Sequence, residues 1–167
     1  MKLESIDELF LHELQDLHSA ERQLIVALPK MANKASSLEL REAIANHLEQ
    51  TKEHVGRIEE ILEDLQLHVG RHKCKAMEGL IAEADEILSA KGLDAVRDAA
   101  MIGAAQRVEH YEIAGYGTAR TYAEMLGYSK AAQTLQQTLD EEKEADELLS
   151  ALAITNVNIE AQNEAEL

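Results

Sequence analysis

The sequence contains little of what strands, hairpins and disulfide frameworks need. It has one cysteine, one proline, eight glycines and no tryptophan among 167 residues, and aromatic residues make up 3%. A single cysteine excludes an intramolecular disulfide and any CxxC motif, so we expect a reducing, cytoplasmic environment. The shortage of aromatic and turn-forming residues disfavours strands and tight hairpins. The composition therefore predicts an all-α protein.

Basic residues and long apolar runs are also scarce. Lys and Arg total 16 against 32 Asp and Glu, which gives a formal net charge of -16. Such a charge repels phosphate backbones and anionic lipid. No stretch approaches the roughly 18 apolar residues of a membrane span, and no basic segment followed by an apolar run opens the chain. We therefore expect neither nucleic acid nor a membrane as a partner.

Apolar residues recur at helical spacing along two long N-terminal segments. Ser5 and Glu8 have the spacing of a capping box, and the pattern that follows predicts a first helix up to about Lys34. Ser36 and Glu39 repeat that spacing, so a second long helix is expected to begin there and to extend to about residue 65. Together these segments predict an α-hairpin.

A shorter apolar pattern at about 74–90 predicts a crossover helix, and two further long helices are expected at 94–125 and from 129 to about 154. The polar residues 157–167 are expected to fray. The whole chain, 1–167, has the length of a single domain. This order of elements predicts a four-helix bundle with a short crossover helix between helices two and three.

Several acidic residues fall on the apolar faces of these helices instead of facing water. At about 100° per residue, five carboxylates from three helices project into one interior. On the second helix Glu49 and Glu53 fall on the outer side, and His54 is the inward ligand that we select, with Gln50 as a neutral companion. The five inward acids are Glu21, Glu109, Glu112, Glu142 and Asp146.

A single glutamate on such a face usually covers apolar surface with its stem. Several together are different, because burying like charges costs several kcal/mol each unless a cation or protons neutralise them. Oxygen-rich coordination with one or two imidazoles suits iron or manganese, and this many carboxylates can hold a bridged pair of ions. The sequence predicts one or two such ions, held by Glu21, Gln50, His54, Glu109, Glu112, Glu142 and Asp146.

A second face of the third long helix consists of small residues. Gly103, Ala114, Gly117 and Thr121 would let another helix approach closely. We interpret this face as a packing surface or as the contact of a homodimer.

The residues named above lie in five recognisable segments: LQDLHSAERQLIVALPKM, HLEQT, KCKAMEGLI, VEHYEIAGYGTA and LDEEKEAD. In these segments the chain resembles the YciF/YciE family of ferritin-like bacterial stress proteins, which are related to rubrerythrin and other di-iron carboxylate proteins. The resemblance implies a ferritin-like four-helix bundle, a homodimer and a role in the stress response. Relatives commonly carry an acid at the position of Gln50, so that ligand is lost here or replaced by His54.

Two classes of function remain open from the sequence. In the first, the interior acids and His54 hold metal ions that react with oxygen or peroxide, with Tyr116 as a hydrogen-bond donor or redox neighbour. In the second, the bundle keeps a degraded metal site and acts as a structural or interaction protein. The five inward acids favour the first class, and Gln50 favours the second. The sequence assigns no catalytic residue.

Overall fold

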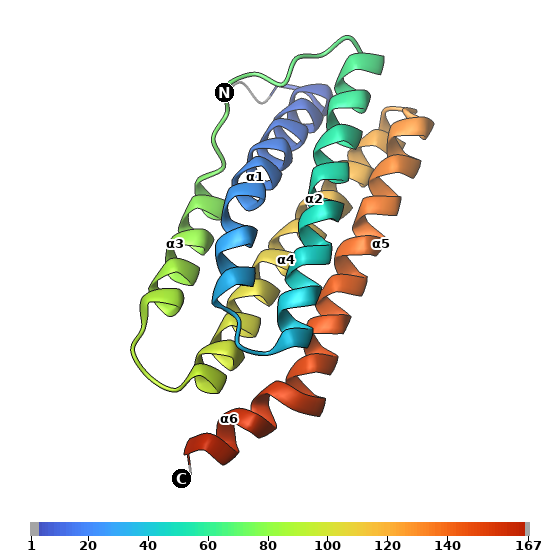
Figure 1. The fold of residues 1–167 in the computed structure, drawn as a ribbon. Coiled ribbons are helices and arrows are strands. Elements are labelled where there is room, and N and C mark those ends of the chain that lie inside the picture. The colour runs from blue at the N-terminus through green and yellow to red at the C-terminus, as the bar shows by residue number, and fades with distance from the viewer. Residues whose placement is uncertain (1–3, 166–167) are drawn as a thin grey trace.

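The computed structural model describes residues 4–165, and every secondary-structure element in this range is a helix (Figure 1). Residues 1–3 and 166–167 lie outside the described part. The elements, in chain order, are α1 (Ile6–Lys34), α2 (Leu38–Asp64), α3 (Lys75–Ser89), α4 (Asp94–Met125), α5 (Ser129–Leu152), the π-helical turn η1 (Ala153–Val157) and α6 (Asn158–Ala165).

Four long helices form the bundle. Helices α1 and α2 pair as one hairpin, α4 and α5 as another, and α1 packs on α4 (Figure 1). The long connection between the hairpins carries α3, which lies against α1 and α4. The predicted fold, a ferritin-like four-helix bundle with a short crossover helix between helices two and three, is confirmed.

The helix starts follow the capping chemistry with one correction. Ser5 caps α1, since its hydroxyl accepts a hydrogen bond from the Glu8 amide at 3.2 Å. The expected cap of α2 at Ser36 is wrong, because Ser37 accepts from the Leu40 amide at 3.3 Å. Ser36 instead donates its amide and its hydroxyl to Asp98 of α4. A tertiary contact therefore sets the start of α2.

The C-terminal segment expected to fray from residue 157 is helical as far as Ala165. The π-helical turn η1 joins α5 to α6, and Val157 at its end is only 1% exposed. Val157 belongs to the same apolar cluster as Leu149, and α6 packs against α4. Val157 is thus packed into the core, and the segment that follows it is helical although none of its residues is buried.

The core consists of two apolar clusters, one toward each end of the bundle. One contains Leu24 and Leu28 of α1 with Leu149 of α5, and the other contains Leu14 and Leu17 of α1. Near the middle, α1 and α4 approach so closely that a Cβ added at Gly115 would lie 2.7 Å from Leu17 Cδ2. The residues between the two clusters are mostly polar, and they form the candidate site.

No helix within residues 4–165 is long and apolar enough to cross a membrane. On the small-residue face of α4, Ala114 and Thr121 are exposed, and Gly103 and Gly117 are half-buried. The homodimer that this face suggested stays a prediction.

Candidate metal centre

A polar layer crosses the bundle between the two apolar clusters. Each of the four long helices contributes polar residues to this layer from its inward face, which is apolar on both sides of the layer. On α1, for example, Glu21 lies between Leu17 and Leu24. The buried members of the layer are at most 7% exposed and comprise Glu21, His47, Thr51, His54, Glu109, Glu112 and Glu142. Helical periodicity turns these side chains inward, and the packing of the four long helices brings them to one level.

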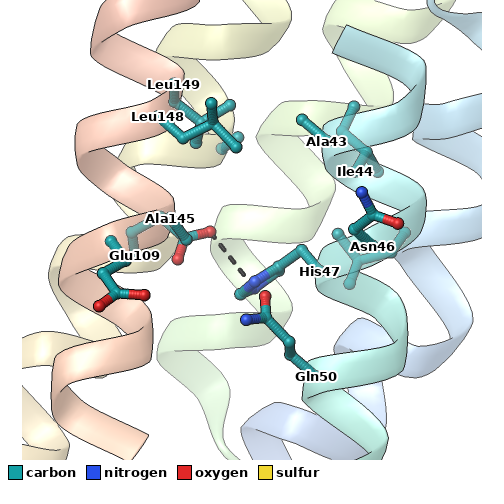
Figure 2. Close-up of a pocket in the computed structure, with 12 residues that line it drawn as sticks. Ala43, Ile44, Asn46, His47, Gln50, Glu109, Ala145, Leu148 and Leu149 are labelled. Atoms are coloured by element: carbon teal, nitrogen blue, oxygen red, sulfur yellow. Dashed lines mark ion pairs between the residues drawn. The ribbon is translucent and has the colours of Figure 1, made fainter. Parts of the chain in front are cut away.

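Four of these side chains form the first group. His47, Glu109, Glu112 and Glu142 each offer a ligand atom, and these atoms all lie within 4.8 Å of one another. His47 Nε2 is 3.5 Å from Glu109 Oε1 and 3.8 Å from Glu142 Oε2. Figure 2 shows His47 reaching from α2 toward Glu109. The group therefore provides one imidazole and three carboxylates at one point.

A second group shares one member with the first. Glu21, His54 and Glu142 also bring ligand atoms within 4.8 Å of one another. His54 Nδ1 lies 2.9 Å from Glu142 Oε1 and 3.3 Å from Glu21 Oε1. Because Glu142 belongs to both groups, its carboxylate is placed to bridge two cations.

Several buried oxygens in this layer lack hydrogen-bond donors. Both carboxylate oxygens of Glu112 have no hydrogen-bond partner within the described residues, and neither has Glu21 Oε2 or Glu109 Oε2. A buried acceptor without a donor is costly, and a buried charge without a partner is more so. Oxygen-rich ligands with imidazole suit iron or manganese, so the donor set fits the predicted ions.

In the metal-free protein, protons neutralise part of this charge. Burial raises the pKa of Glu21 to about 7. Burial, together with repulsion from neighbouring carboxylates, raises the pKa of Glu109 and of Glu112 well above the ordinary value of 4.5. Desolvation and like charges both disfavour the ionised forms.

His54 holds a proton where a metal would bind. Burial by itself would lower the pKa of His54, but the contacts with Glu142 and Glu21 outweigh burial and raise it to about 11. The Nδ1 proton thus lies between the two carboxylates that would otherwise share a cation. A metal ion bound at Nδ1 has to displace that proton, so binding is linked to proton release.

The second ring nitrogen of His54, Nε2, contacts the ion pair of Glu141 and Arg57. His54 Nε2 lies 2.8 Å from Glu141 Oε2, and Arg57 donates to both oxygens of Glu141, at 2.6 and 3.0 Å. Although partial burial opposes it, hydrogen bonding to Arg57 lowers the pKa of Glu141 to about 2. A carboxylate that accepts the second N–H of a ligating histidine fixes the ring and its tautomer. Glu141 therefore directs Nδ1 toward the interior acids.

Tyr116 closes the layer on the side of Glu21. Its side chain is fully buried, and its hydroxyl donates a hydrogen bond to Glu21 Oε1. Burial and the surrounding carboxylates raise the pKa of Tyr116 well above 10. The phenol therefore stays protonated and acts as a donor to this carboxylate.

Five of the predicted ligands meet in this layer: Glu21, His54, Glu109, Glu112 and Glu142. Asp146 lies outside both groups, because Gln106 Nε2 of α4 donates to it at 3.0 Å and His110 Nε2 is 3.3 Å away. Gln50 is half-buried and lies in the wall of an adjacent cavity. Glu49 faces solvent as expected, with 68% of its side chain exposed.

His47 is the site residue that sequence reasoning did not select as a ligand. It lies on the same apolar stripe as Ile44 and Thr51, and it precedes His54 by seven residues, or two helical turns. This seven-residue spacing is the feature of the sequence that could have identified His47 as a ligand. Choosing His47 together with His54, instead of Gln50, would have identified the imidazole of the first group.

Comparisons with known proteins agree with this geometry. The family described as a domain of unknown function, DUF892, matches residues 5–162. The chain belongs to the DUF892 family. Protein YciF of Escherichia coli is 50% identical over 166 residues, which cover 99% of this chain and 100% of that protein. The resemblance to YciF proteins is confirmed, and this DUF892 chain is a homologue of a stress protein.

Solved structures of relatives share the fold. The crystal structure of the E. coli stress protein YciF superposes with a TM-score of 0.90 at 50% identity, covering 93% of this chain and 99% of that one. YcfI of Rhodopseudomonas palustris, for which a structural role has been suggested, gives 0.86 at 38% identity over 89% and 95%. A Xanthomonas campestris protein at 21% identity, with a TM-score of 0.76 over 96% and 99%, shares the fold.

Proposed function

We propose that this DUF892 protein binds a pair of iron or manganese ions in the polar layer and serves the stress response through their reaction with oxygen or peroxide. The observation that carries the proposal is the set of buried carboxylate oxygens without donors, above all both oxygens of Glu112. A structural cluster of acids would be stabilised by donors or left at the surface. This one is aimed at a common centre.

Each side chain has a role in such a centre. His47, Glu109 and Glu112 would hold one ion, Glu21 and His54 would hold the other, and Glu142 would contribute to both, since it belongs to both groups. A bound iron or manganese ion supplies redox and Lewis-acid chemistry at this point. Glu141 orients His54, and the Tyr116 hydroxyl donates to Glu21 and can supply a proton there. The two apolar clusters above and below exclude bulk water from the layer.

The cellular setting follows from the relatives and the composition. The name of the E. coli relative supports a role in stress. A single buried cysteine without a disulfide partner suits the reducing cytoplasm. We expect a homodimer that uses the small-residue face of α4, and no nucleic-acid partner because of the charge of -16.

A structural role is the second candidate. Gln50 in place of an acid and the displacement of Asp146 toward Gln106 both reduce the carboxylates available for metal. The suggestion made for the R. palustris relative points the same way. In that case the interior acids stay protonated and the protein acts through its surface.

Metal analysis of protein purified without chelator distinguishes the two candidates. We expect up to two equivalents of iron or manganese per chain. We also expect stabilisation by added Mn(II), since a ligand at 100 times its Kd that binds only the folded state contributes about 2.7 kcal/mol. Glu142→Gln should abolish both effects, because Glu142 belongs to both groups.

The matched control is Glu147→Gln on the same helix, where the side chain is exposed. It removes the same charge and should leave metal uptake and stabilisation unchanged. Metal content near zero in wild-type protein grown in iron- and manganese-rich medium would reject the metal function. Equal uptake by the two variants would show that the bound metal lies elsewhere.

A further inference from the structure

A cavity of about 340 Å³ lies between α2 and α5, next to the metal centre (Figure 2). It exists because small side chains face each other across this helix pair: Ala43 on α2 and Ala145 on α5 are in its wall. Leu28, Ile44 and Leu149 supply apolar wall from the cluster toward the α1–α2 turn. A volume above about 300 Å³ lies in the range of pockets that bind small molecules.

The cavity connects the surface to the centre. Asn46 and Glu144 are exposed at its outer part, whereas His47 and Glu109 in its lining are 7% and 3% exposed. His47 and Glu109 also belong to the first metal group. Neither ring nitrogen of His47, nor Glu109 Oε2, has a hydrogen-bond partner within residues 4–165. The inner end of the cavity is therefore polar and buried, and these donor and acceptor atoms are free to bind a ligand.

These features define the molecule that fits. A volume of 340 Å³ corresponds to roughly eleven water molecules, or an organic molecule of roughly ten non-hydrogen atoms. The apolar wall favours an apolar body, and the inner end favours one hydrogen-bonding group. An anion would meet Glu109 and Glu144, and a cation would lose its hydration against the Leu and Ala side chains.

We propose that the α2–α5 cavity is the substrate chamber of the metal centre and binds a small uncharged organic molecule whose single polar group reaches His47 and Glu109. The assignment as a substrate chamber rests on the proposed metal function, whereas the binding itself requires only the cavity. Such a chamber places an organic molecule beside the first ion position without contact with the second group.

The test uses four molecules of one shape: benzyl alcohol, toluene, benzoate and benzylammonium. Binding to metal-free, full-length protein is followed by NMR shifts of the Ala43 and Ala145 methyl groups. We expect benzyl alcohol to bind with a Kd on the order of 1 mM, as is usual for a molecule of this size. Toluene should bind at least several-fold more weakly, and the two ions should not bind detectably.

A filled cavity provides the matched comparison. Ala145→Leu adds bulk to the cavity wall, and Ala151→Leu makes the same change at an exposed position of the same helix. We expect at least ten-fold weaker benzyl alcohol binding in Ala145→Leu and no change in Ala151→Leu. Both variants should take up Mn(II) like the wild type, since neither position belongs to the metal groups.

Loading with Mn(II) then tests the link between cavity and metal. Paramagnetic broadening of the bound benzyl alcohol signals in wild-type protein would support the chamber. Equal binding by Ala145→Leu, tighter binding of benzoate or benzylammonium, or an absence of broadening in the Mn(II)-loaded protein would overturn it. Benzyl alcohol binding without any metal uptake would reject the proposed metal function and keep the cavity assignment. Metal uptake without benzyl alcohol binding would reject the cavity assignment and keep the proposed metal function.

Discussion

Two buried carboxylates of α4 have opposite surroundings. Asp98 is 1% exposed, and its oxygens accept hydrogen bonds from the amides of Ser36 and Ser37 at 2.7–3.1 Å and from the Ser36 hydroxyl at 2.6 Å. Glu112, fourteen residues further along the same helix, is 0% exposed, and neither of its oxygens has a hydrogen-bond partner within the described residues. One acid is stabilised by its contacts, and the other is destabilised by burial.

The difference distinguishes an acid that stabilises the fold from an acid whose burial is unfavourable without a cation or a proton. The donors around Asp98 lie at the start of α2, where free amides and the helix dipole favour an anion. The groups around Glu112 are other acids and histidines, which favour an added cation instead. Acidic residues that look alike on a helical wheel thus serve opposite purposes, and the following changes test this contrast.

The largest expected effect is that of Asp98→Ala. The change leaves the buried amide of Ser37 and the amide and hydroxyl of Ser36 without their acceptor. We expect a loss of about 3 kcal/mol in the free energy of unfolding, measured by urea denaturation. Asp94→Ala, at an exposed position in the first turn of α4, is the control and should cost less than about 1 kcal/mol. Equal losses of stability in the two variants would show that the hydrogen bonds of Asp98 contribute no more than an exposed acid in the first turn of α4.

The second effect is the pH dependence of the metal-free protein. The folded pKa of Glu21 is about 7 against 4.5 in the unfolded chain, so the native state binds more protons between these values. The contribution of Glu21 to stability should therefore be greatest near pH 4.5 and fall by on the order of 2–3 kcal/mol as pH rises to 7. The raised pKa values of Glu109 and Glu112 act in the same direction. His54 adds a smaller fall in the same direction near pH 7, because its folded pKa is about 11 and the unfolded imidazole loses its proton at about 6.5. His47 acts in the opposite direction, because burial lowers its pKa.

The measurement is urea denaturation at several pH values in the presence of a chelator. Stability that rises with pH over this window would show that the interior acids are stabilised in some other way. Added Mn(II) should reverse the slope, since metal binding to the layer releases protons and tightens as pH rises.

Glu112→Gln comes next in size. The substitution removes an acid that burial and repulsion disfavour, so it should stabilise the metal-free protein by about 2 kcal/mol at pH 7 and by much less at pH 5. The same change should weaken metal binding in the first group. Glu147→Gln alters the net charge equally at an exposed site, so the difference between the two variants isolates the interior effect. Destabilisation by Glu112→Gln would place Glu112 with Asp98 as a structural acid.

The smallest effect concerns Glu141, which contacts His54 from outside the layer. Glu141→Gln should weaken Mn(II) binding about ten-fold, or ~1.4 kcal/mol, because the His54 ring loses the carboxylate that orients it. Calorimetric titration measures this change. Asp140→Asn, on the neighbouring exposed position, should leave the affinity unaltered. The metal stoichiometry should stay the same in both variants, since neither residue belongs to the two groups.

The sequence by itself determined the helices and the direction of most interior acids. Helical periodicity and terminal signals predicted Asp94–Met125 as the structure has it, and the same periodicity turned Glu21, Glu112 and Glu142 inward. These features are local, because the backbone repeat of 3.6 residues fixes where each side chain points relative to its own helix. Gln50 and His47 lie close together on that repeat, and the sequence prediction selected Gln50 and not His47.

Only the tertiary structure decided which inward residues meet. Gln106 and His110 of α4 hold Asp146 away from the centre, Asp98 moves the start of α2 to Ser37, and Val157 is packed into the core. The cavity between Ala43 and Ala145 likewise depends on two helices that are about a hundred residues apart in sequence. A helical wheel describes one helix, whereas these outcomes depend on the height, separation and side chains of its neighbours.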